Sequence, residues 1–275
     1  MWTGCANWKH GGPNPARRRF DVPGPENVFT RPRACPPRRR MSEADPDSGE
    51  RLAKRVAAQL HCSRREAEQL VAQGAVTVDG EAATQPQQRV RPDQRVAVTP
   101  GAQPQAMVPG TLLVHKPAGL DWNAPGFWGR IERDGQDALH GRPAVPGLFM
   151  GQRCVAPLGI RESGLLVFSQ VAGIARRLLD DAPLVEHEFA LEVAGAVAPD
   201  QLARLRPARA SINRQTDTLT GLRVVLHGPD PGQIAALCRA AGLAPTALRR
   251  LRIGRLSMAG LAPGHWRCLR PQERF

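Results

Sequence analysis

The sequence contains no tyrosine, no Cys-x-x-Cys pair and no apolar run that approaches the ~20 residues of a membrane span. Its first residues also lack the apolar core of a secretory signal, so we expect neither secretion nor membrane attachment. The cysteines are widely scattered, which argues against a zinc site or a disulfide framework and favours a reducing cytoplasm. They are Cys5, Cys35, Cys62, Cys154, Cys238 and Cys268. We expect no metal and no cofactor.

Positive charge is the strongest compositional feature. The 275 residues include 38 Lys and Arg against 25 Asp and Glu, a formal charge of +13, and 41% of them are hydrophobic, enough for a packed core. Such an excess of positive charge favours polyanionic partners through phosphate contacts and counterion release. A soluble basic protein from an arginine-rich proteome would have the same composition, so charge alone leaves both interpretations open. We expect one or two domains in a monomer.

Residues 1–48 differ in composition from the rest of the chain. Within residues 1–40, nine Lys and Arg accompany two acidic residues and seven prolines without a periodic apolar pattern, which predicts disorder. One interpretation is a basic arm that reaches along RNA. The other, which we favour, is a mis-assigned start, with Met41 as the true first residue. Without residues 1–40 the formal charge is still +6.

Residues 49–98 have the pattern of a small helical module. Apolar residues recur every four positions from Leu52 to Leu60, which predicts a first helix. Ser63 then lies at an N-cap position with Glu66 three residues later. This capping-box spacing predicts the start of a second helix.

Three short segments of this module carry a recognisable pattern. Residues 74–80, Gly-Ala-Val-Thr-Val-Asp-Gly, predict a helix stop, a strand and an Asp-Gly turn, and residues 95–98 predict a second strand. Residues 51–54 read Arg-Leu-Ala-Lys, and residues 62–68 read Cys-Ser-Arg-Arg-Glu-Ala-Glu. Together these segments resemble the small RNA-binding module first described in a ribosomal small-subunit protein.

The resemblance implies RNA contact from the second helix of this module. Arg64 and Arg65 lie in its first turn, where exposed backbone N–H groups and the positive end of the helix dipole already favour phosphate. Guanidinium groups add bidentate hydrogen bonds to that preference. The predicted RNA-binding residues of the module are Arg51, Lys54, Arg55, Arg64 and Arg65.

A second domain is expected at residues 111–275, after a linker at residues 99–110 that holds three prolines and two glycines. Residues 120–152 have no period and many glycines and prolines, which predicts a loop or insertion. Its aromatic side chains could stack on splayed RNA bases, but we expect them to pack. They are Trp122, Phe127 and Trp128. Further along, a buried strand is predicted at 165–168 and a helix at 172–179.

Residues 155–168 read Val-Ala-Pro-Leu-Gly-Ile-Arg-Glu-Ser-Gly-Leu-Leu-Val-Phe. They resemble the active-site motif of the ribosomal RNA pseudouridine synthases, roughly Gly-Arg-Leu-Asp-x-x-Thr-Ser-Gly-Leu-Leu, in which the Asp does the chemistry. Aligned on the Ser-Gly-Leu-Leu run, the Asp position falls on Gly159, which has no side chain to act as nucleophile or base. The only acid between Asp137 and Asp180 is Glu162. It lies three residues away on a loop of fixed geometry, so we expect it not to substitute.

Three more family motifs are present with changes. Residues 112–119, Leu-Leu-Val-His-Lys-Pro-Ala-Gly, resemble the strand and Asn-Lys-Pro-x-Gly turn that places a lysine beside the cleft, which makes Lys116 a predicted RNA-binding residue. Phe189 stands at the Tyr of the family's Lys-x-Tyr pair. Ala235 stands at the first Arg of its Gln-Ile-Arg-Arg-Met helix, the Arg that normally pairs with the catalytic Asp.

The C-terminal motifs are better kept. Residues 248–256 and 261–269 follow the family's Leu-x-Arg-x-x-Ile-Gly and Leu-x-x-Gly-x-x-Arg-x-Leu patterns. Strand alternation predicts Arg250 and Arg252 on one face. With Arg249 they either line an RNA surface or guard a solvated strand edge, and the pattern does not choose between these.

The resemblance covers about residues 49–272 and implies an α+β fold, a small helical RNA-binding module followed by a synthase domain on a mixed, mostly antiparallel sheet. The absence of both the Asp and its Arg partner is physically consistent. A buried Arg without its acidic partner would be an unpaired charge that destabilises the fold by several kcal/mol. We therefore predict a non-catalytic RNA-binding protein, with ribosomal RNA as the partner. The alternatives are an active pseudouridine synthase that uses Glu162, and a protein-interaction module that no longer binds RNA.

Overall fold

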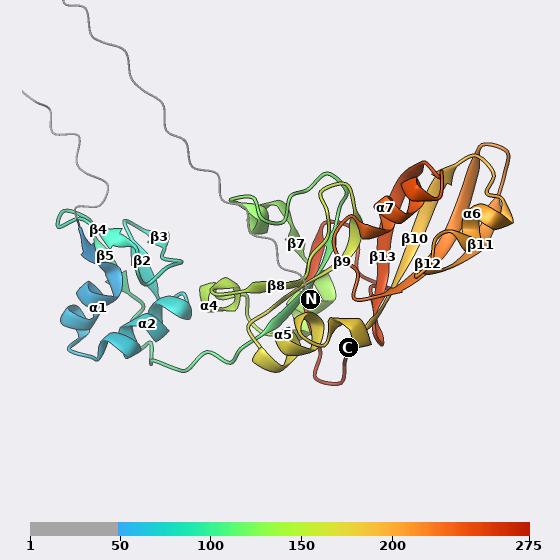
Figure 1. The fold of residues 1–275 in the computed structure, drawn as a ribbon. Helices are drawn as coiled ribbons and strands as arrows, with labels where there is room; N and C mark the ends of the chain where they lie inside the picture. Colours follow the sequence, from blue (N-terminus) through green and yellow to red (C-terminus); the bar gives the residue numbers. More distant parts are fainter. Residues whose placement is uncertain (1–48) are drawn as a thin grey trace, which may run out of the picture. The chain divides into compact units, whose positions relative to one another are not determined.

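The computed structural model describes residues 49–275, and the basic segment at 1–48, for which we predict disorder, lies outside the described residues. The first part of the described chain contains two helices, α1 (Leu52–Leu60) and α2 (Arg64–Ala72), with small antiparallel sheets (Figure 1). One sheet has the strand order β3 (Glu81–Ala82), β2 (Val76–Val78), β5 (Val96–Val98). In the other, β1 (Glu50–Arg51) pairs with β4 (Arg89–Val90).

Local signals in the sequence account for the ends of both helices. α1 ends at His61, whose φ of 52° is left-handed. The predicted capping box of α2 is confirmed: the Ser63 Oγ accepts a hydrogen bond from the Glu66 N–H at 3.2 Å, and Glu66 Oε2 accepts one from the Ser63 N–H at 2.7 Å. Apolar faces of both helices then pack against β2 and β5 in one core. Its buried members include Leu52, Val56, Leu70, Val71, Val76 and Val96.

Residues 99–110 contain neither helix nor strand, and a ten-stranded sheet follows. Its order is β11 (Arg209–Gln215), β12 (Leu219–His227), β10 (Glu186–Ala194), β13 (Pro245–Ile253), β9 (Ser163–Ser169), β6 (Thr111–Lys116), β15 (His265–Cys268) and β7 (Glu132–Arg133). Off this path, β8 (Arg153–Ala156) pairs with β9 and β14 (Leu256–Ser257) with β13. Only the β13–β9 and β15–β7 pairings in the described chain are parallel. The predicted mixed, mostly antiparallel α+β fold is confirmed.

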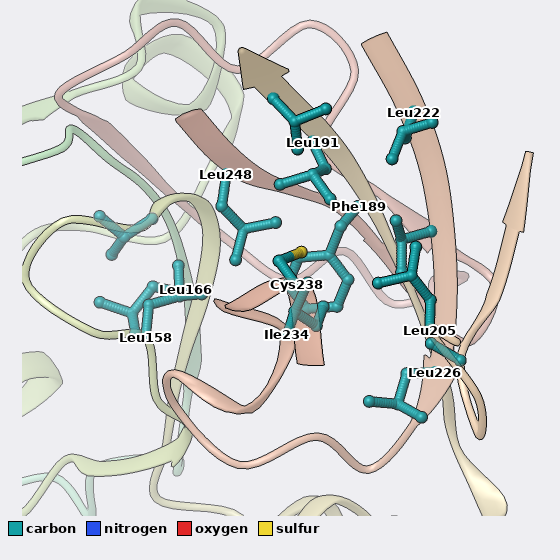
Figure 2. Packing of buried hydrophobic residues seen from close by; sticks show 14 of the residues in the cluster. Leu158, Leu166, Phe189, Leu191, Leu205, Leu222, Leu226, Ile234, Cys238 and Leu248 are labelled. Atoms are coloured by element: carbon teal, nitrogen blue, oxygen red, sulfur yellow. The ribbon is translucent and has the colours of Figure 1, made fainter. Parts of the chain in front are cut away.

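Strand alternation gives this sheet two apolar faces. Leu166 and Phe168 of β9 belong to one cluster, which we call the first core, and Leu165 and Val167 belong to another, the second core. Helix α7 (Gln233–Ala240) packs into the first core through Ile234 and Cys238, beside Phe189 and Leu248 (Figure 2). Helix α5 (Ala172–Leu179) packs into the second core through Leu178. The predicted helix at 172–179 is therefore confirmed.

Residues 120–152 contain more regular structure than the predicted loop. They form η1 (Phe127–Arg130), β7, α3 (Gly135–His140) and α4 (Pro146–Phe149). Their aromatic rings pack as we expected: the ring centroids of Trp128 and Phe168 lie 4.8 Å apart, and those of Phe127 and Phe168 lie 5.7 Å apart. These rings are therefore part of the first core. None of the described helices is both long and apolar enough to cross a membrane.

Candidate functional site

The motif that resembles the synthase active site lies in the turn that joins β8 to β9. Strand β9 runs between β6 and β13, so this turn emerges from the middle of the sheet. Gly164, the motif glycine, has a φ of +105°, and a Cβ on it would lie 2.2 Å from the carbonyl oxygen of Arg250 on β13. Only glycine allows β9 and β13 to approach this closely.

The side chain of Glu162 folds back onto Gly159. Its Oε2 accepts a hydrogen bond from the Gly159 N–H at 2.7 Å. A Cβ built on Gly159 would lie 3.3 Å from the Glu162 Cδ and 3.4 Å from its Oε2. Spacing along the chain predicts that Glu162 is too distant to substitute for the missing Asp. The structure instead brings its carboxylate next to the place where a side chain on residue 159 would begin.

Both oxygens of this carboxylate are engaged by backbone amides. Oε1 of Glu162 accepts a hydrogen bond from the Gly232 N–H at 2.8 Å, and Gly232 is the N-cap of α7, with a φ of 80°. Glu162 is only 8% exposed. One carboxylate therefore ties the motif turn to the start of α7. Sequence reasoning missed this contact because 70 residues separate the partners.

Arg250 lies beneath this turn, 1% exposed, and forms no ion pair among the described residues. Its guanidinium donates to backbone carbonyl oxygens, from Nε to Leu165 at 2.7 Å, from Nη1 to Pro157 at 3.2 Å and from Nη2 to Ala156. Burial lowers the pKa of Arg250 to about 10, although the charge of Glu162 acts in the opposite direction. Arg250 thus holds the ends of β8 and β9 by satisfying three carbonyl groups.

The placement of Arg250 corrects the prediction that it shares a face with Arg252. The pairing of β10 with β13 shifts register, so Glu188 is opposite Arg252 while the next residue, Phe189, is opposite Arg250. A bulge of this kind adds one residue to one strand and breaks the alternation of side chains. Arg252 consequently lies beside Glu186 and Glu188, which accept its hydrogen bonds at 2.6 and 2.7 Å. Neither Arg250 nor Arg252 is left free for RNA, whereas Arg249 is exposed.

His187, two residues before Phe189, is buried beside Arg250. Its Nδ1 lies 3.5 Å from the Arg250 Nη1, and its Nε2 has no hydrogen-bond partner among the described residues. Burial, together with the nearby positive charges of Arg250 and His227, lowers the pKa of His187 to about 3. His187 is therefore neutral at neutral pH and adds no positive charge to the site.

Lys116 is fully buried at the end of β6. Its ammonium donates to the carbonyl oxygens of Glu162 at 2.7 Å and of Pro117 and Ile160 at 3.0 Å each, and burial lowers its pKa. All three N–H groups are thus used within the protein. This placement argues against the predicted direct contact of Lys116 with RNA and makes it a support for the motif turn.

The space beside Glu162 is nearly filled. It is bounded by the motif turn, by the Pro-Asp-Pro run at 229–231, and by Phe189, Ile234 and Arg250, and its volume is about 10 Å³. That volume is room for about one water molecule. Phe189 and Ile234 belong to the first core (Figure 2), and Ala235 follows on α7, partly exposed and without a charge. Among the described residues, no group of His, Cys, Asp or Glu side chains is placed to hold a metal ion.

The predicted RNA-binding residues of the first module are exposed to different degrees. Arg51 and Arg65 are exposed and form no ion pair with a described residue. Lys54 pairs with Glu50 at 3.0 Å, and Arg64 pairs with Glu68 at 3.6 Å, both on the surface. Arg55 is half-buried and donates to the carbonyl oxygens of Arg91 at 2.7 Å and Gln94 at 3.1 Å. Such surface ion pairs are weak, so Lys54 and Arg64 can give them up for contacts with phosphate. The guanidinium of Arg55, in contrast, is already hydrogen-bonded within the protein.

Comparison with known proteins finds relatives for both parts of the chain. The S4 domain family model matches residues 50–96. The ribosomal large subunit pseudouridine synthase B of Haemophilus influenzae is 29% identical over 262 residues, which cover 88% of this chain and 70% of that protein. An uncharacterized RNA pseudouridine synthase of Mycobacterium tuberculosis is 30% identical over 245 residues, 82% of this chain and 91% of that protein. A crystal structure of a pseudouridylate synthase matches with a TM-score of 0.43 and 16% identity, covering 80% of this chain and 96% of that one.

The chain is therefore built from an S4 RNA-binding domain followed by a pseudouridine synthase domain. It belongs to the RNA pseudouridine synthase family. The predicted position of that family's Asp is Gly159, and the carboxylate of Glu162 lies beside this residue.

Proposed function

We propose that this protein binds RNA, with ribosomal RNA as the partner, and does not isomerise uridine. The observation that carries the proposal is the hydrogen bonding of the Glu162 carboxylate to backbone amides. Glu162 is the acid nearest to the position of the missing Asp, and backbone N–H groups of Gly159 and Gly232 occupy both of its oxygens at 2.7 and 2.8 Å. The space beside it measures about 10 Å³.

Isomerisation makes two demands that this arrangement does not meet. The target base must leave the RNA stack and enter a pocket, and while Glu162 ties the motif turn to Gly232 the space beside it, with room for about one water molecule, is too small for a uracil ring. A carboxylate must also be free to approach the sugar or the base, whereas each Glu162 oxygen accepts a backbone N–H that ties it to the motif turn or to the start of α7 and weakens it as a nucleophile. Loss of a positioned acid–base group costs ~10²–10⁴ in rate, and loss of a covalent nucleophile can cost more.

RNA binding is supported by the first domain and by the relatives. The S4 match covers the helix that begins at Arg64, where two arginines stand at a helix N-terminus. The Haemophilus influenzae relative is named for the large ribosomal subunit, which favours ribosomal RNA and a cytoplasmic site of action. The formal charge of +13 has the sign that such a partner requires.

An active enzyme is the second candidate, because Glu162 Oε2 lies 3.4 Å from the Cβ position of Gly159. The test is to incubate the natural chain and Glu162→Gln with a ribosomal RNA transcript and to measure pseudouridine by nucleoside chromatography. We expect none from either protein. Pseudouridine from the natural chain that disappears in a folded Glu162→Gln variant would establish the second candidate.

The S4 domain yields a separate prediction about RNA affinity. Replacing Arg64 and Arg65 by Ala should weaken binding to ribosomal RNA at low salt and lower the slope of log K against log salt by roughly 1 for each lost phosphate contact. Fluorescence anisotropy at several salt concentrations measures both effects. Glu68→Gln is the matched control, since it frees Arg64 from its ion pair and should strengthen binding. Unchanged affinity and slope in the double Ala variant would contradict RNA contact by this helix.

A further inference from the structure

A groove on the synthase domain is lined by arginines from separate segments of the chain. Arg255 lies in the turn between β13 and β14, and Arg270 and Arg274 lie in the segment that follows β15. The groove has a volume of about 480 Å³, within the ~300–1,000 Å³ of typical ligand sites. We propose that this groove is a second RNA-binding site, which holds the phosphate backbone. The proposal rests on the RNA-binding function proposed above.

The acidic side chains of the groove already accept hydrogen bonds from other groups of the protein. Asp134 caps α3, and its Oδ1 accepts hydrogen bonds from the Gln136 and Asp137 N–H groups at 3.1 Å each. Both oxygens of Glu273 accept hydrogen bonds from the Arg267 guanidinium at 2.7 Å. Arg255 and Arg270 are exposed and form no ion pair with any residue of the described chain. The charge presented to a ligand is therefore positive.

The segment that carries Arg270 and Arg274 is fixed on both sides. The pair of Arg267 with Glu273 is only 10% and 19% exposed, and Glu273 Oε2 also accepts the Arg270 N–H at 2.8 Å. At the other end, Phe275 packs against the second core. The Arg274 Nη1 donates to the Glu273 carbonyl oxygen at 2.7 Å, which holds its side chain against the segment. Binding a ligand would consequently immobilise little additional backbone.

The chemistry of the groove fits a phosphodiester better than other anions of the same charge. Guanidinium groups donate pairs of parallel N–H groups to phosphate oxygens. The side chains of Gln136, Gln272 and Ser257 line the same groove. They add uncharged donors of the kind that contact the sugar and phosphate of a nucleic acid. An extended chain of phosphates can engage several of these arginines at once, whereas inorganic phosphate can engage few.

The experiment compares Arg255→Ala combined with Arg270→Ala against a variant of equal charge, Arg176→Ala combined with Arg177→Ala on α5. Anisotropy titrations with a labelled ribosomal RNA fragment at several salt concentrations give the dissociation constant and the salt slope. For the groove variant we expect a roughly tenfold weaker Kd at low salt and a salt slope lower by about 1.5–2. The α5 variant should show a clearly smaller change in both.

Equal changes in the two variants, or no change in the groove variant, would overturn the proposal. Either result would mean that the groove arginines contribute no more to RNA affinity than other positive charges of the protein. Competition by millimolar inorganic phosphate that equals the effect of unlabelled RNA would also overturn it, in favour of a small-anion site. The Arg64→Ala and Arg65→Ala variant, titrated in parallel, separates the two hypotheses. If that variant loses affinity while the groove variant does not, only the groove is wrong. If the natural chain binds no RNA, the proposed function fails as well.

Discussion

A triple variant that restores the family pattern, Gly159→Asp with Glu162→Thr and Ala235→Arg, is expected to form pseudouridine where the natural chain forms none. The three changes return the Asp, the Thr that follows it and the Arg that pairs with the Asp. Glu162→Thr also removes the hydrogen bond that ties the motif turn to Gly232, which lets the Pro-Asp-Pro run at 229–231 move away and open the space for a base. Phe189 can stay, since the ring is kept at that position. Relative to the same variant without the Asp, the rate should rise by at least ~10²-fold.

Gly159→Asp alone should not be sufficient. A Cβ at residue 159 would lie 3.3 Å from the Glu162 Cδ, so the new carboxylate would be forced against an existing one. Like charges in a poorly hydrated site repel and compete for the same hydrogen-bond donors. The measurement is pseudouridine per RNA molecule, by nucleoside chromatography, for the natural chain, the single variant, the double variant without the Asp, and the triple variant. An inactive triple variant that folds and binds RNA would show that catalysis requires changes at further positions besides these three.

Replacement of Arg250 should clearly destabilise the synthase domain. Arg250→Met leaves the carbonyl oxygens of Ala156, Pro157 and Leu165 without this donor, at a cost of about 1–3 kcal/mol for each buried group. The variant also removes the free-energy cost of burying the guanidinium charge, which stabilises the fold. The fall in pKa from 12.5 to about 10 corresponds to a relief of roughly 3 kcal/mol. With a middle value of about 2 kcal/mol for each of the three carbonyl groups, the net expectation is a loss of about 3 kcal/mol in the free energy of unfolding.

Urea unfolding followed by circular dichroism measures this loss. The control is Arg249→Met on the neighbouring residue of the same strand, which is exposed and should change the free energy of unfolding by less than about 0.5 kcal/mol. If Arg250→Met proved as stable as the natural chain, the carbonyl groups must find other donors, and Arg250 would not be what holds β8 and β9 together.

Local patterns in the sequence were sufficient for much of the fold. The capping box at Ser63 and Glu66 needs only four residues of sequence, and α2 begins where it indicates. The apolar run at 165–168 is a buried strand, and the helix at 172–179 has the predicted bounds. The cap and the helices depend on residues close in the chain, so spacing and periodicity reveal them, whereas the strand pairs with distant strands and is revealed by its unbroken apolar run.

The candidate site depended on contacts that spacing does not reveal. The Glu162 side chain returns to Gly159 because the intervening turn reverses direction, and its second partner, Gly232, comes from a distant loop. Arg250 is buried because a bulge opposite Phe189 changes the face on which it lies. Loss of the family's Arg at Ala235 indicates removal of an unpaired charge. The structure nevertheless keeps a buried Arg at residue 250, satisfied by carbonyl oxygens rather than by an acid.

The most direct measurement is a map of pseudouridine in ribosomal RNA from the organism that encodes this protein, with its gene present and deleted. If Glu162 serves only to hold backbone amides, the two maps should be identical at every uridine. One pseudouridine that vanishes on deletion, returns with the natural chain and fails to return with Glu162→Gln would contradict the account.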